Sequence, residues 1–440
     1  MAKFVLIGSG LAGGLLGAYL GRRGYDVDLY ERRADPRAGN FVGGRSINLA
    51  LSTRGIHALQ QLGIADEVLR HAIPMRGRMI HGKSGDLHFA PYDRDPNKYI
   101  NSIGRASLNT AVIEAAQRYP NVRVKFNHNC TDVDLDAPVA HLLNTETNQM
   151  IEARGDAVIG VDGAFSAVRQ SMQRQLDRFE YDESYLAHGY KELTIPPAPD
   201  GGWRMEKEAL HIWPRKSFMM IALPNPDGSF TCTLFWEFKG PRSFESTQTG
   251  DDVRRFFDKE FPDAVPLMPT LLEDFRENPT GSLVTIRCAP WHYKDKVALV
   301  GDAAHAVVPF YGQGMNAAFE DCVVLDACLA EFPNDRERAF AEYFSRRKEN
   351  ADALAALAVE NFIEMRDKTA SKRFRAKKKL DHLLEGLLPG IYLPLYTMVS
   401  FTRIPYAEAA RRAGRQDRVV YASLVALIML IVAMLIVLLR

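Results

Sequence analysis

Two glycine-rich segments, separated by nearly 300 residues, have the spacing of a nucleotide site. The first, Gly8-Ser-Gly10-Leu-Ala-Gly13, follows an apolar strand from Phe4 to Gly8 and should open a helix. A glycine turn of this kind lets backbone N–H groups and a helix N-terminus face a pyrophosphate without side-chain interference. Glu31 ends a second predicted strand, Asp26 to Tyr30, where a carboxylate can accept hydrogen bonds from ribose hydroxyls. Taken alone, this unit fits NAD or FAD.

The second segment favours FAD. The apolar strand Val297 to Val300 leads to Gly301-Asp302, and Gly312-Gln-Gly-Met-Asn316 follows Pro309 and should start another helix. A carboxylate at a strand end suits ribityl hydroxyls, and a helix N-terminus favours the electron-rich edge of a reduced flavin. Between the two segments, the run Ala157 to Arg169 predicts a third strand end at Asp162-Gly163.

In their order and spacing, these three segments resemble the single-component FAD-dependent aromatic hydroxylases, in which NADPH has no domain of its own. The resemblance implies a chemistry that belongs to the cofactor, since NADPH reduces the flavin and O2 then forms a C4a-hydroperoxide. It also implies that Asp162, Gly163 and Arg169 serve both FAD and NADPH. The cofactor-binding residues expected from the motifs and the resemblance are Gly8, Gly10, Ala12, Gly13, Glu31, Arg32, Arg33, Ala50, Arg105, Cys130, Asp162, Gly163, Ala167, Asp302, Gly314, Met315 and Asn316.

Other segments are similar to the branch of that family that converts L-kynurenine to 3-hydroxy-L-kynurenine. They are Gly44 to Ser52, Ile73 to His81, Leu210 to Arg215, Asn361 to Arg366 and Ile391 to Val399. The resemblance implies that the amino-acid head group of the substrate is held by Arg78, Tyr92, Asn361 and Tyr396. An arginine fork can indeed bind a carboxylate through two parallel charge-assisted bonds.

Pro309 and Gln313 are the candidate catalytic residues, because they could shape a dry cavity around the flavin. Roles as turn and capping residues are as compatible with their positions. Two other functions stay open at this point: hydroxylation of another aromatic acid, and a FAD-binding membrane adaptor without turnover. A flavin halogenase is disfavoured, because its tryptophan-rich motif and lysine have no counterpart here.

The pattern of elements predicts an α/β fold, with a Rossmann-like FAD-binding domain and an antiparallel β-sheet domain for the substrate. Phe218 to Leu223 and Phe230 to Phe238 should pair as a hairpin across Asn225-Pro-Asp-Gly228. A strand from Arg76 to His81 could join that sheet. The predicted domains are 1–75, 98–185 and 285–335 for FAD, 76–97 and 186–284 for substrate, and a helical region at 336–416.

Composition limits the other possibilities. The chain has 440 residues, 47% of them apolar, and a formal net charge of +1, which does not favour a nucleic-acid partner. Its five cysteines have no CxxC or zinc-ligand spacing, so we expect free thiols and no metal site. The first predicted strand starts at residue 4, which leaves no room for a cleavable signal peptide.

The C-terminal region is the exception to this ordinary soluble composition. Val419 to Leu439 contains no charged residue and, as a helix, would span the hydrocarbon core of about 30 Å. Four arginines precede the segment, at positions 411, 412, 415 and 418, and only Arg440 follows it. By the positive-inside rule, we expect a membrane anchor with the catalytic body on the cytoplasmic side.

Overall fold

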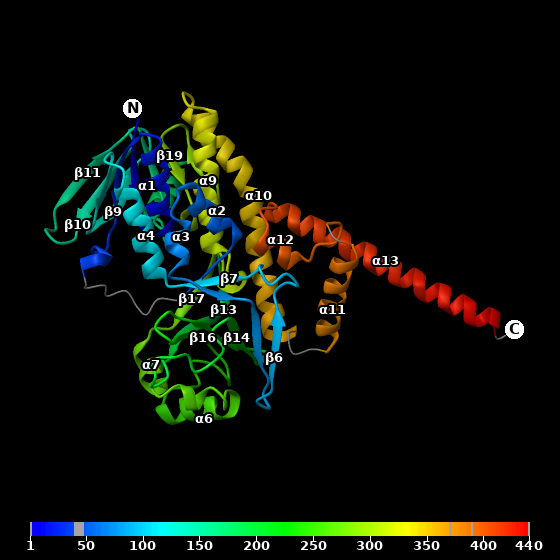
Figure 1. Ribbon diagram of the computed structural model, residues 1–440. Helices are drawn as coiled ribbons and strands as arrows, with labels where there is room; N and C mark the ends of the chain where they lie inside the picture. The colour runs from blue at the N-terminus through cyan, green and yellow to red at the C-terminus, as the bar shows by residue number, and fades with distance from the viewer. Residues whose placement is uncertain (1, 39–47, 369–371, 389, 439–440) are drawn as a thin grey trace.

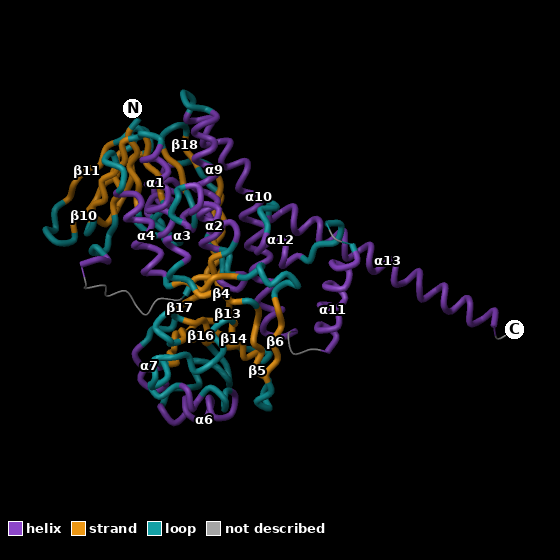
Figure 2. The backbone as a smooth tube through the Cα atoms, in the orientation of Figure 1, coloured by secondary structure: helices purple, strands orange, loops and turns teal. Residues whose placement is uncertain are grey.

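The computed structural model describes residues 2–38, 48–368, 372–388 and 390–438. Two sequence-based predictions fall partly outside these ranges: residues 44–47 of the segment that is similar to the kynurenine-hydroxylating branch, and Leu439 at the end of the predicted membrane anchor. Figure 2 shows the strands gathered in an upper and a lower group, with helices around the upper one. These strands and helices confirm the predicted α/β fold class.

The upper body is built on a six-stranded sheet of order β18-β19-β12-β1-β2-β8, parallel except for β18. Its strands are β1 (Lys3–Ile7), β2 (Asp26–Tyr30), β8 (Val122–Lys125), β12 (Ala157–Gly160), β18 (His292–Tyr293) and β19 (Val297–Leu299). Three of the inner strands, β1, β12 and β19, are nearly continuous apolar runs because a parallel sheet is covered on both faces, whereas β2 carries the buried Asp28. Their carboxyl ends meet at one edge, which is where such folds bind ligands.

Helices close this body. The helix α1 (Leu11–Arg22) packs against α4 (Arg105–Gln117) and α9 (Gly314–Glu331), as Figure 1 also shows. Shorter helices complete the layer, namely α2 (Thr53–Gln61), α3 (Ala65–Leu69), α5 (Ala167–Gln175) and α8 (Asp302–His305). Because α1, α8 and α9 all begin at strand ends or glycine turns, their N-termini lie on the ligand-binding side of the sheet.

The lower sheet has seven strands in the order β17-β13-β16-β15-β14-β5-β6. The predicted hairpin is confirmed, since β15 (Met219–Pro224) and β16 (Phe230–Glu237) pair antiparallel. The predicted strand near Arg78 is also confirmed as β5 (Gly77–His81), which pairs in parallel with β14 (Ala209–Pro214). The remaining elements of this part are β6 (Leu87–Pro91), β13 (Glu180–Ile195), β17 (Gly281–Ala289), α6 (Gly250–Glu260) and α7 (Leu271–Glu277).

Two small sheets were not expected from the sequence. One consists of β9 (His128–Asp134), β10 (Val139–Asn144) and β11 (Met150–Arg154), and β9 packs against α5. The other consists of β3 (Leu49–Leu51), β7 (Ile100–Ile103) and β4 (Ile73–Met75). The long strands β13 and β17 also cross the predicted domain boundaries at 185 and 285, so the two parts are joined by continuous sheet strands.

The C-terminal part is helical, as the sequence predicted. The helix α10 (Arg336–Ile363) runs beside both parts, and α11 (Lys372–Leu387), α12 (Leu395–Phe401) and α13 (Tyr406–Leu438) follow. In Figure 1 the red end of α13 projects away from the body. This is the one described helix that is long and apolar enough to cross a membrane, and none of its apolar window is buried.

Candidate active site

The first glycine turn is a cradle in which each glycine has a separate role. Gly8 has φ = 103°, and a Cβ there would lie 2.6 Å from the backbone oxygen of Val161. A Cβ on Gly13 would lie 1.9 Å from the backbone oxygen of Gly8. A Cβ on Gly10 would meet nothing within 4 Å. Gly8 and Gly13 therefore permit close packing of strand and helix, and Gly10 keeps the ligand side of the turn open.

Glu31 lies where the sequence placed it, at the end of β2. Its Oε2 accepts a hydrogen bond from the N–H of Ser9 at 2.8 Å, and its Oε1 accepts one from the N–H of Arg33 at 3.1 Å. These bonds fix the carboxylate beside the glycine turn and leave acceptor capacity for ribose hydroxyls. The side chains of Arg32 and Arg33 are exposed next to it.

Asp162 follows β12 at the same edge of the sheet. Its Oδ2 accepts from the N–H of Ala167 at 2.7 Å, whereas its Oδ1 is buried and has no protein partner. Burial raises the pKa of this carboxyl. Gly163, at φ = 84°, leaves open space where a side chain would be. A buried acceptor without a partner beside an open glycine is consistent with a bound group that donates a hydrogen bond.

Two other predicted residues lie around Asp162. Cys130, on β9, is half-buried, and burial together with the charge of Asp162 raises its pKa to about 12, so it is a neutral thiol. Arg169 is buried and donates to the backbone oxygens of Ala303 at 2.8 Å and Ala164 at 2.6 Å. In this structure Arg169 therefore ties the Asp162 segment to α8.

Asp302 begins α8, directly after β19 and Gly301. Its side chain is exposed, yet the surrounding protein desolvates the carboxyl group and raises its pKa above the ordinary value. The charges of His305 and Arg105 act in the opposite direction and favour the carboxylate. An accessible carboxylate at the centre of the sheet edge can accept hydrogen bonds from the hydroxyls of a ribityl chain.

The segment from Gly312 to Asn316 is held against Ala50 and Ser52. Asn316 Nδ2 donates to the oxygen of Ala50 at 2.8 Å, and its Oδ1 accepts from the N–H of Ser52 at 2.9 Å. Gly312 is left-handed at φ = 65°, and a Cβ there would lie 2.9 Å from the Cβ of Ala50. This arrangement presents the start of α9, with Gly314 and the half-buried Met315, to the sheet edge. Ala12, on α1, lies at the same sheet edge, because a Cβ built on Gly301 would be 3.5 Å from the Cβ of Ala12.

The structure brings three of the four predicted substrate residues together. Arg78 comes from β5, Tyr92 follows β6, and Tyr396 comes from α12. The guanidinium carbon of Arg78 lies 4.9 Å from the ring centroid of Tyr396 and 5.8 Å from that of Tyr92. The two tyrosine rings stack with centroids 5.2 Å apart. A cation over aromatic faces is held in place without losing its charge.

Two buried polar atoms of this cluster make no hydrogen bond of standard geometry within the protein, namely Nε of Arg78 and the hydroxyl of Tyr92. The Tyr92 hydroxyl does lie close enough to Tyr396 and Arg78 for both to act on its pKa. Burial raises the pKa of Tyr92 well above its ordinary value, so the hydroxyl is a donor at neutral pH. Burial disfavours the charge of Arg78, but Tyr396, Tyr92 and Glu364 outweigh it and raise its pKa. The cluster therefore offers a cation and a hydroxyl, and a carboxylate can accept hydrogen bonds from both.

Asn361, the fourth predicted residue, lies on α10. It is buried, and its Nδ2 donates to the backbone oxygen of Phe310 at 2.7 Å. Phe310 belongs to the short 3-10 turn Pro309–Tyr311, whose Tyr311 ring stacks on Tyr396 with centroids 5.7 Å apart. Asn361 thus fixes the turn that carries Pro309 and is linked to the Arg78 cluster through Tyr311.

Three side chains at this site carried no signal in the sequence that singled them out. Tyr311 extends the aromatic stack, and Glu364 contributes to the electrostatics of Arg78. Tyr406, from the start of α13, donates a hydrogen bond to Gln313 at 3.1 Å. Within the described ranges no group of three or more His, Cys, Asp or Glu side chains could hold a metal ion.

Comparison with known proteins agrees with this geometry. A family model described as "FAD binding domain" matches residues 1–358. The chain is 48% identical to the kynurenine 3-monooxygenase of Myxococcus xanthus over 415 residues, which cover 94% of this chain and 89% of that protein. It is also 48% identical to the kynurenine 3-monooxygenase of Dictyostelium discoideum, with 92% and 89% coverage.

A solved structure supports the fold independently. The tetrameric form of 2-methyl-3-hydroxypyridine-5-carboxylic acid oxygenase superposes with a TM-score of 0.66 at 21% identity, over 91% of this chain and 96% of that one. This likeness extends across both the cofactor and the substrate parts. From the matched domain and the close relatives, the chain belongs to the FAD-binding flavoprotein monooxygenases and, within them, to the kynurenine 3-monooxygenase family.

Proposed function

We propose that the protein hydroxylates L-kynurenine to 3-hydroxy-L-kynurenine with NADPH and O2. The observation that carries this proposal is the cluster of Arg78, Tyr92 and Tyr396, in which a buried cation and a buried hydroxyl have atoms without a protein partner. An α-carboxylate satisfies both groups, and the stacked tyrosines accommodate the aromatic part of the substrate. Relatives named for this activity match nearly the whole chain.

The residues that would hold FAD are those at the sheet edge. The turn with Gly10 would face the pyrophosphate, Glu31 would accept from the ribose, Asp302 would accept from the ribityl chain, and the N-terminus of α9 would face the flavin ring. When bound, FAD takes electrons from NADPH and uses O2 to deliver one oxygen atom to the aromatic ring. The protein supplies binding, orientation and exclusion of water.

Orientation depends on where the head group is fixed. Arg78 on β5 anchors the carboxylate, and its charge-assisted bonds contribute about 1.5 to 3 kcal/mol each. Because β5 is paired with β14 inside the seven-stranded sheet, the anchor is rigid. A rigid anchor would keep the reacting ring carbon of the substrate, the one beside the aniline nitrogen, at a constant position relative to the flavin. Such orientation of the reacting atoms raises the rate more than tight binding alone does.

Exclusion of water depends on the aromatic and apolar wall. Phe310 stacks on Phe362 with centroids 4.1 Å apart, and Phe235 lies 4.8 Å from Phe310. Together with Tyr311 they form a dense layer between the helical region and the sheet. A dry site keeps the activated oxygen from being lost as hydrogen peroxide. Pro309 and Gln313 shape this side of the site through the backbone that carries them.

The decisive measurement is NADPH oxidation by the FAD-loaded protein, with and without L-kynurenine, with the products separated by chromatography. We expect faster oxidation and 3-hydroxy-L-kynurenine in equal amount to the substrate consumed. Faster oxidation that yields only hydrogen peroxide would mean that another aromatic acid is the substrate. No change in oxidation with any aromatic acid would favour an adaptor without turnover.

We also infer that α13 anchors the protein in a membrane with the catalytic body on the cytoplasmic side. The apolar window of α13 is exposed throughout. Near the start of that window, Arg412 donates to the backbone oxygens of Gly390 and Ile391, and the side chain of Ile391 is 72% exposed. Leu387 is 66% exposed in the same region. These apolar side chains are in the right place to enter the interfacial layer beside the helix.

Deletion of residues 419–440 tests the anchor. The shortened protein should remain in the supernatant after high-speed centrifugation of lysed cells and should keep its FAD. As a control, the full chain should pellet with membranes and resist extraction by high salt or alkaline carbonate. If the shortened protein still pellets with membranes, the anchor lies elsewhere.

A further inference from the structure

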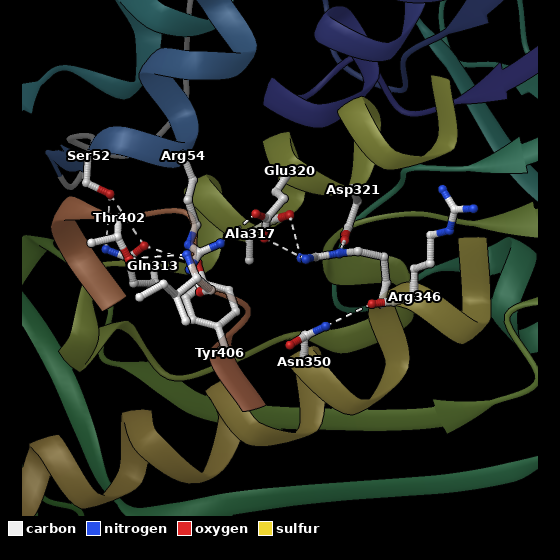
Figure 3. A network of polar contacts seen from close by, with 12 residues as sticks. Ser52, Arg54, Gln313, Ala317, Glu320, Asp321, Arg346, Asn350, Thr402 and Tyr406 are labelled. Atoms are coloured by element: carbon white, nitrogen blue, oxygen red, sulfur yellow. Dashed lines mark hydrogen bonds and ion pairs between the residues drawn. The ribbon is translucent and has the colours of Figure 1, made fainter. Parts of the chain in front are cut away.

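Gln313 is held from two sides by segments that are distant in the sequence. Its side chain is 1% exposed. Its Oε1 accepts from the hydroxyl of Tyr406 at 3.1 Å, and its Nε2 donates to the hydroxyl of Ser52 at 3.2 Å. Figure 3 shows these three side chains pointing toward one another from different parts of the chain. Both polar ends of the amide are therefore paired inside the protein.

Tyr406 is itself immobilised by a buried network of charges. The guanidinium of Arg54 lies 4.1 Å from its ring centroid and pairs with Glu320 at 2.5 Å. Arg54 also donates to the backbone oxygen of Ile404. Arg347 then joins Glu320 at 2.5 Å to Asp321 at 2.6 Å. Burial raises the pKa of Tyr406, so its hydroxyl remains a hydrogen-bond donor across the physiological range.

The position of Gln313 matters because it is the residue immediately before α9. Asn316 already clamps this segment to Ala50 and Ser52. The hydrogen bond from Tyr406 to Gln313 adds a contact with α13, the continuous helix whose C-terminal part is apolar. The loop at 309–316 is therefore held by Ser52, just before α2, by Ala50 of β3 and by Tyr406 at the start of α13.

We propose that Tyr406 is a positioning residue that acts through Gln313 to keep the 309–316 loop in the place where oxygen transfer is coupled to NADPH oxidation. The proposal rests on the proposed function. In the coupled reaction, NADPH, H⁺, O2 and substrate give NADP⁺, hydroxylated product and water. In the uncoupled reaction, NADPH, H⁺ and O2 give NADP⁺ and hydrogen peroxide. Without the hydroxyl of Tyr406, the buried Oε1 of Gln313 loses its nearer donor. It keeps only the Ser52 hydroxyl at 3.4 Å, a group that also accepts from the Nε2 of the same amide, and the loop shifts to satisfy the oxygen.

The test uses Tyr406→Phe in the full-length, FAD-loaded protein in detergent. Phenylalanine keeps the ring under Arg54 and removes only the hydroxyl. We expect the yield of product per NADPH to fall at least twofold, hydrogen peroxide to rise by the same amount, and the KM for L-kynurenine to change less than twofold. The matched control is Tyr19→Phe, because the buried Tyr19 hydroxyl donates to the oxygen of Ala58 at 2.8 Å, on another helix pair. That variant should stay fully coupled.

Two further measurements separate this role from a general structural one. If Tyr406 acts through Gln313, the loss of coupling in the double variant with Gln313→Leu should equal that of Gln313→Leu alone. Hydrogen–deuterium exchange should rise in peptides covering 309–316 in Tyr406→Phe and not in Tyr19→Phe. This exchange does not depend on the substrate, so it also tests the proposal if L-kynurenine gives no product. Unchanged exchange, unchanged coupling or additive losses would each overturn the role of Tyr406.

Discussion

Gly13 lies directly against the backbone of Gly8, so that a Cβ on Gly13 would come within 1.9 Å of the Gly8 oxygen. The middle glycine of the turn, Gly10, has no such neighbour within 4 Å. The same motif thus contains a position that needs glycine for packing and a position where the ligand needs the space.

This difference predicts opposite outcomes for two alanine variants. Gly13→Ala should be destabilised or insoluble, because backbone must move to admit the methyl group. Gly10→Ala should fold, since its φ of −70° suits alanine, but should bind FAD more weakly. Thermal unfolding of the apoproteins and titration with FAD would measure the two effects. Equal stability of both variants would contradict this reading of the turn.

Arg78 should control affinity for the substrate and not for the cofactor. Arg78→Lys keeps the charge but loses the fork, and Arg78→Ala loses both, so the KM for L-kynurenine should rise about 10-fold or more in the first and up to about 100-fold in the second. FAD content should stay at the wild-type level. The matched control is Arg76→Ala, two residues away, which pairs with Glu208 at the surface. Its KM should be unchanged, and a similar rise there would argue against a specific anchor.

Tyr92 offers a test in which stability and function move in different directions. Tyr92→Phe removes a buried hydroxyl that makes no hydrogen bond of standard geometry within the protein, so the free energy of unfolding should change little. The KM should rise about 2- to 10-fold if the substrate carboxylate accepts from that hydroxyl. Tyr392→Phe is the converse control, because the Tyr392 hydroxyl donates to Asp381 at 2.7 Å. It should lower stability and leave the KM as it is.

Arg347 should be essential for folding stability. It is buried between Glu320 and Asp321, and Arg347→Met leaves both carboxylates in the interior without it. Breaking a buried pair of this kind costs about 3 to 5 kcal/mol. Urea denaturation at neutral pH would measure the loss. The control Arg346→Met removes two partly exposed pairs, with Glu331 and Glu342, and should cost less than about 1 kcal/mol.

The same network predicts a dependence of stability on pH. Burial opposes the charge of Asp321, but His305 and Arg347 outweigh it and lower its pKa below the ordinary value. Its contribution is therefore present at neutral pH and is lost as the pH falls below about 4 through the lowered pKa. The difference in unfolding free energy between wild type and Asp321→Asn should be largest near pH 7 and shrink below about pH 4. A constant difference would mean that the charge of Asp321 is not what stabilises the fold.

The sequence predicted features that depend on neighbouring residues, and it did not predict contacts between residues far apart in the chain. Glu31, Asp162 and Asp302 each lie at or shortly after the end of a strand that the sequence predicted, so local pattern alone placed them at one sheet edge. The role of Arg78 needed the resemblance to relatives, because one arginine on a strand has no local signature. The bond between Tyr406 and Gln313 joins residues 93 apart, and that from Arg54 to Ile404 joins residues 350 apart. Contacts of that range depend on how whole elements pack, which periodicity does not encode.

The sheet of β9, β10 and β11 was missed for a different reason. Its two outer strands, β9 and β11, are mostly half-buried or exposed and rich in polar residues, for example Thr131, Asp132 and Asp134 on β9, so their alternation is weak. Ser171 and Gln175 of α5 instead hold β9 through hydrogen bonds to its backbone. Pairing that depends on such side chains leaves no hydrophobic period to read.

The continuity of α13 has a mechanical consequence. Tyr406 and Val419 are 13 residues apart on one helix, which is a distance of roughly 20 Å. The first turns of α13, from Tyr406 to Ala413, pack against the body, so the apolar part leaves the body in a fixed direction. With the apolar end inserted, the body could not tumble freely above a bilayer as one on a disordered linker could. The segment 309–316, which is bonded to Tyr406, would stay at an almost constant height above the lipid, and soluble substrates would reach it only from a thin layer of solution along the membrane.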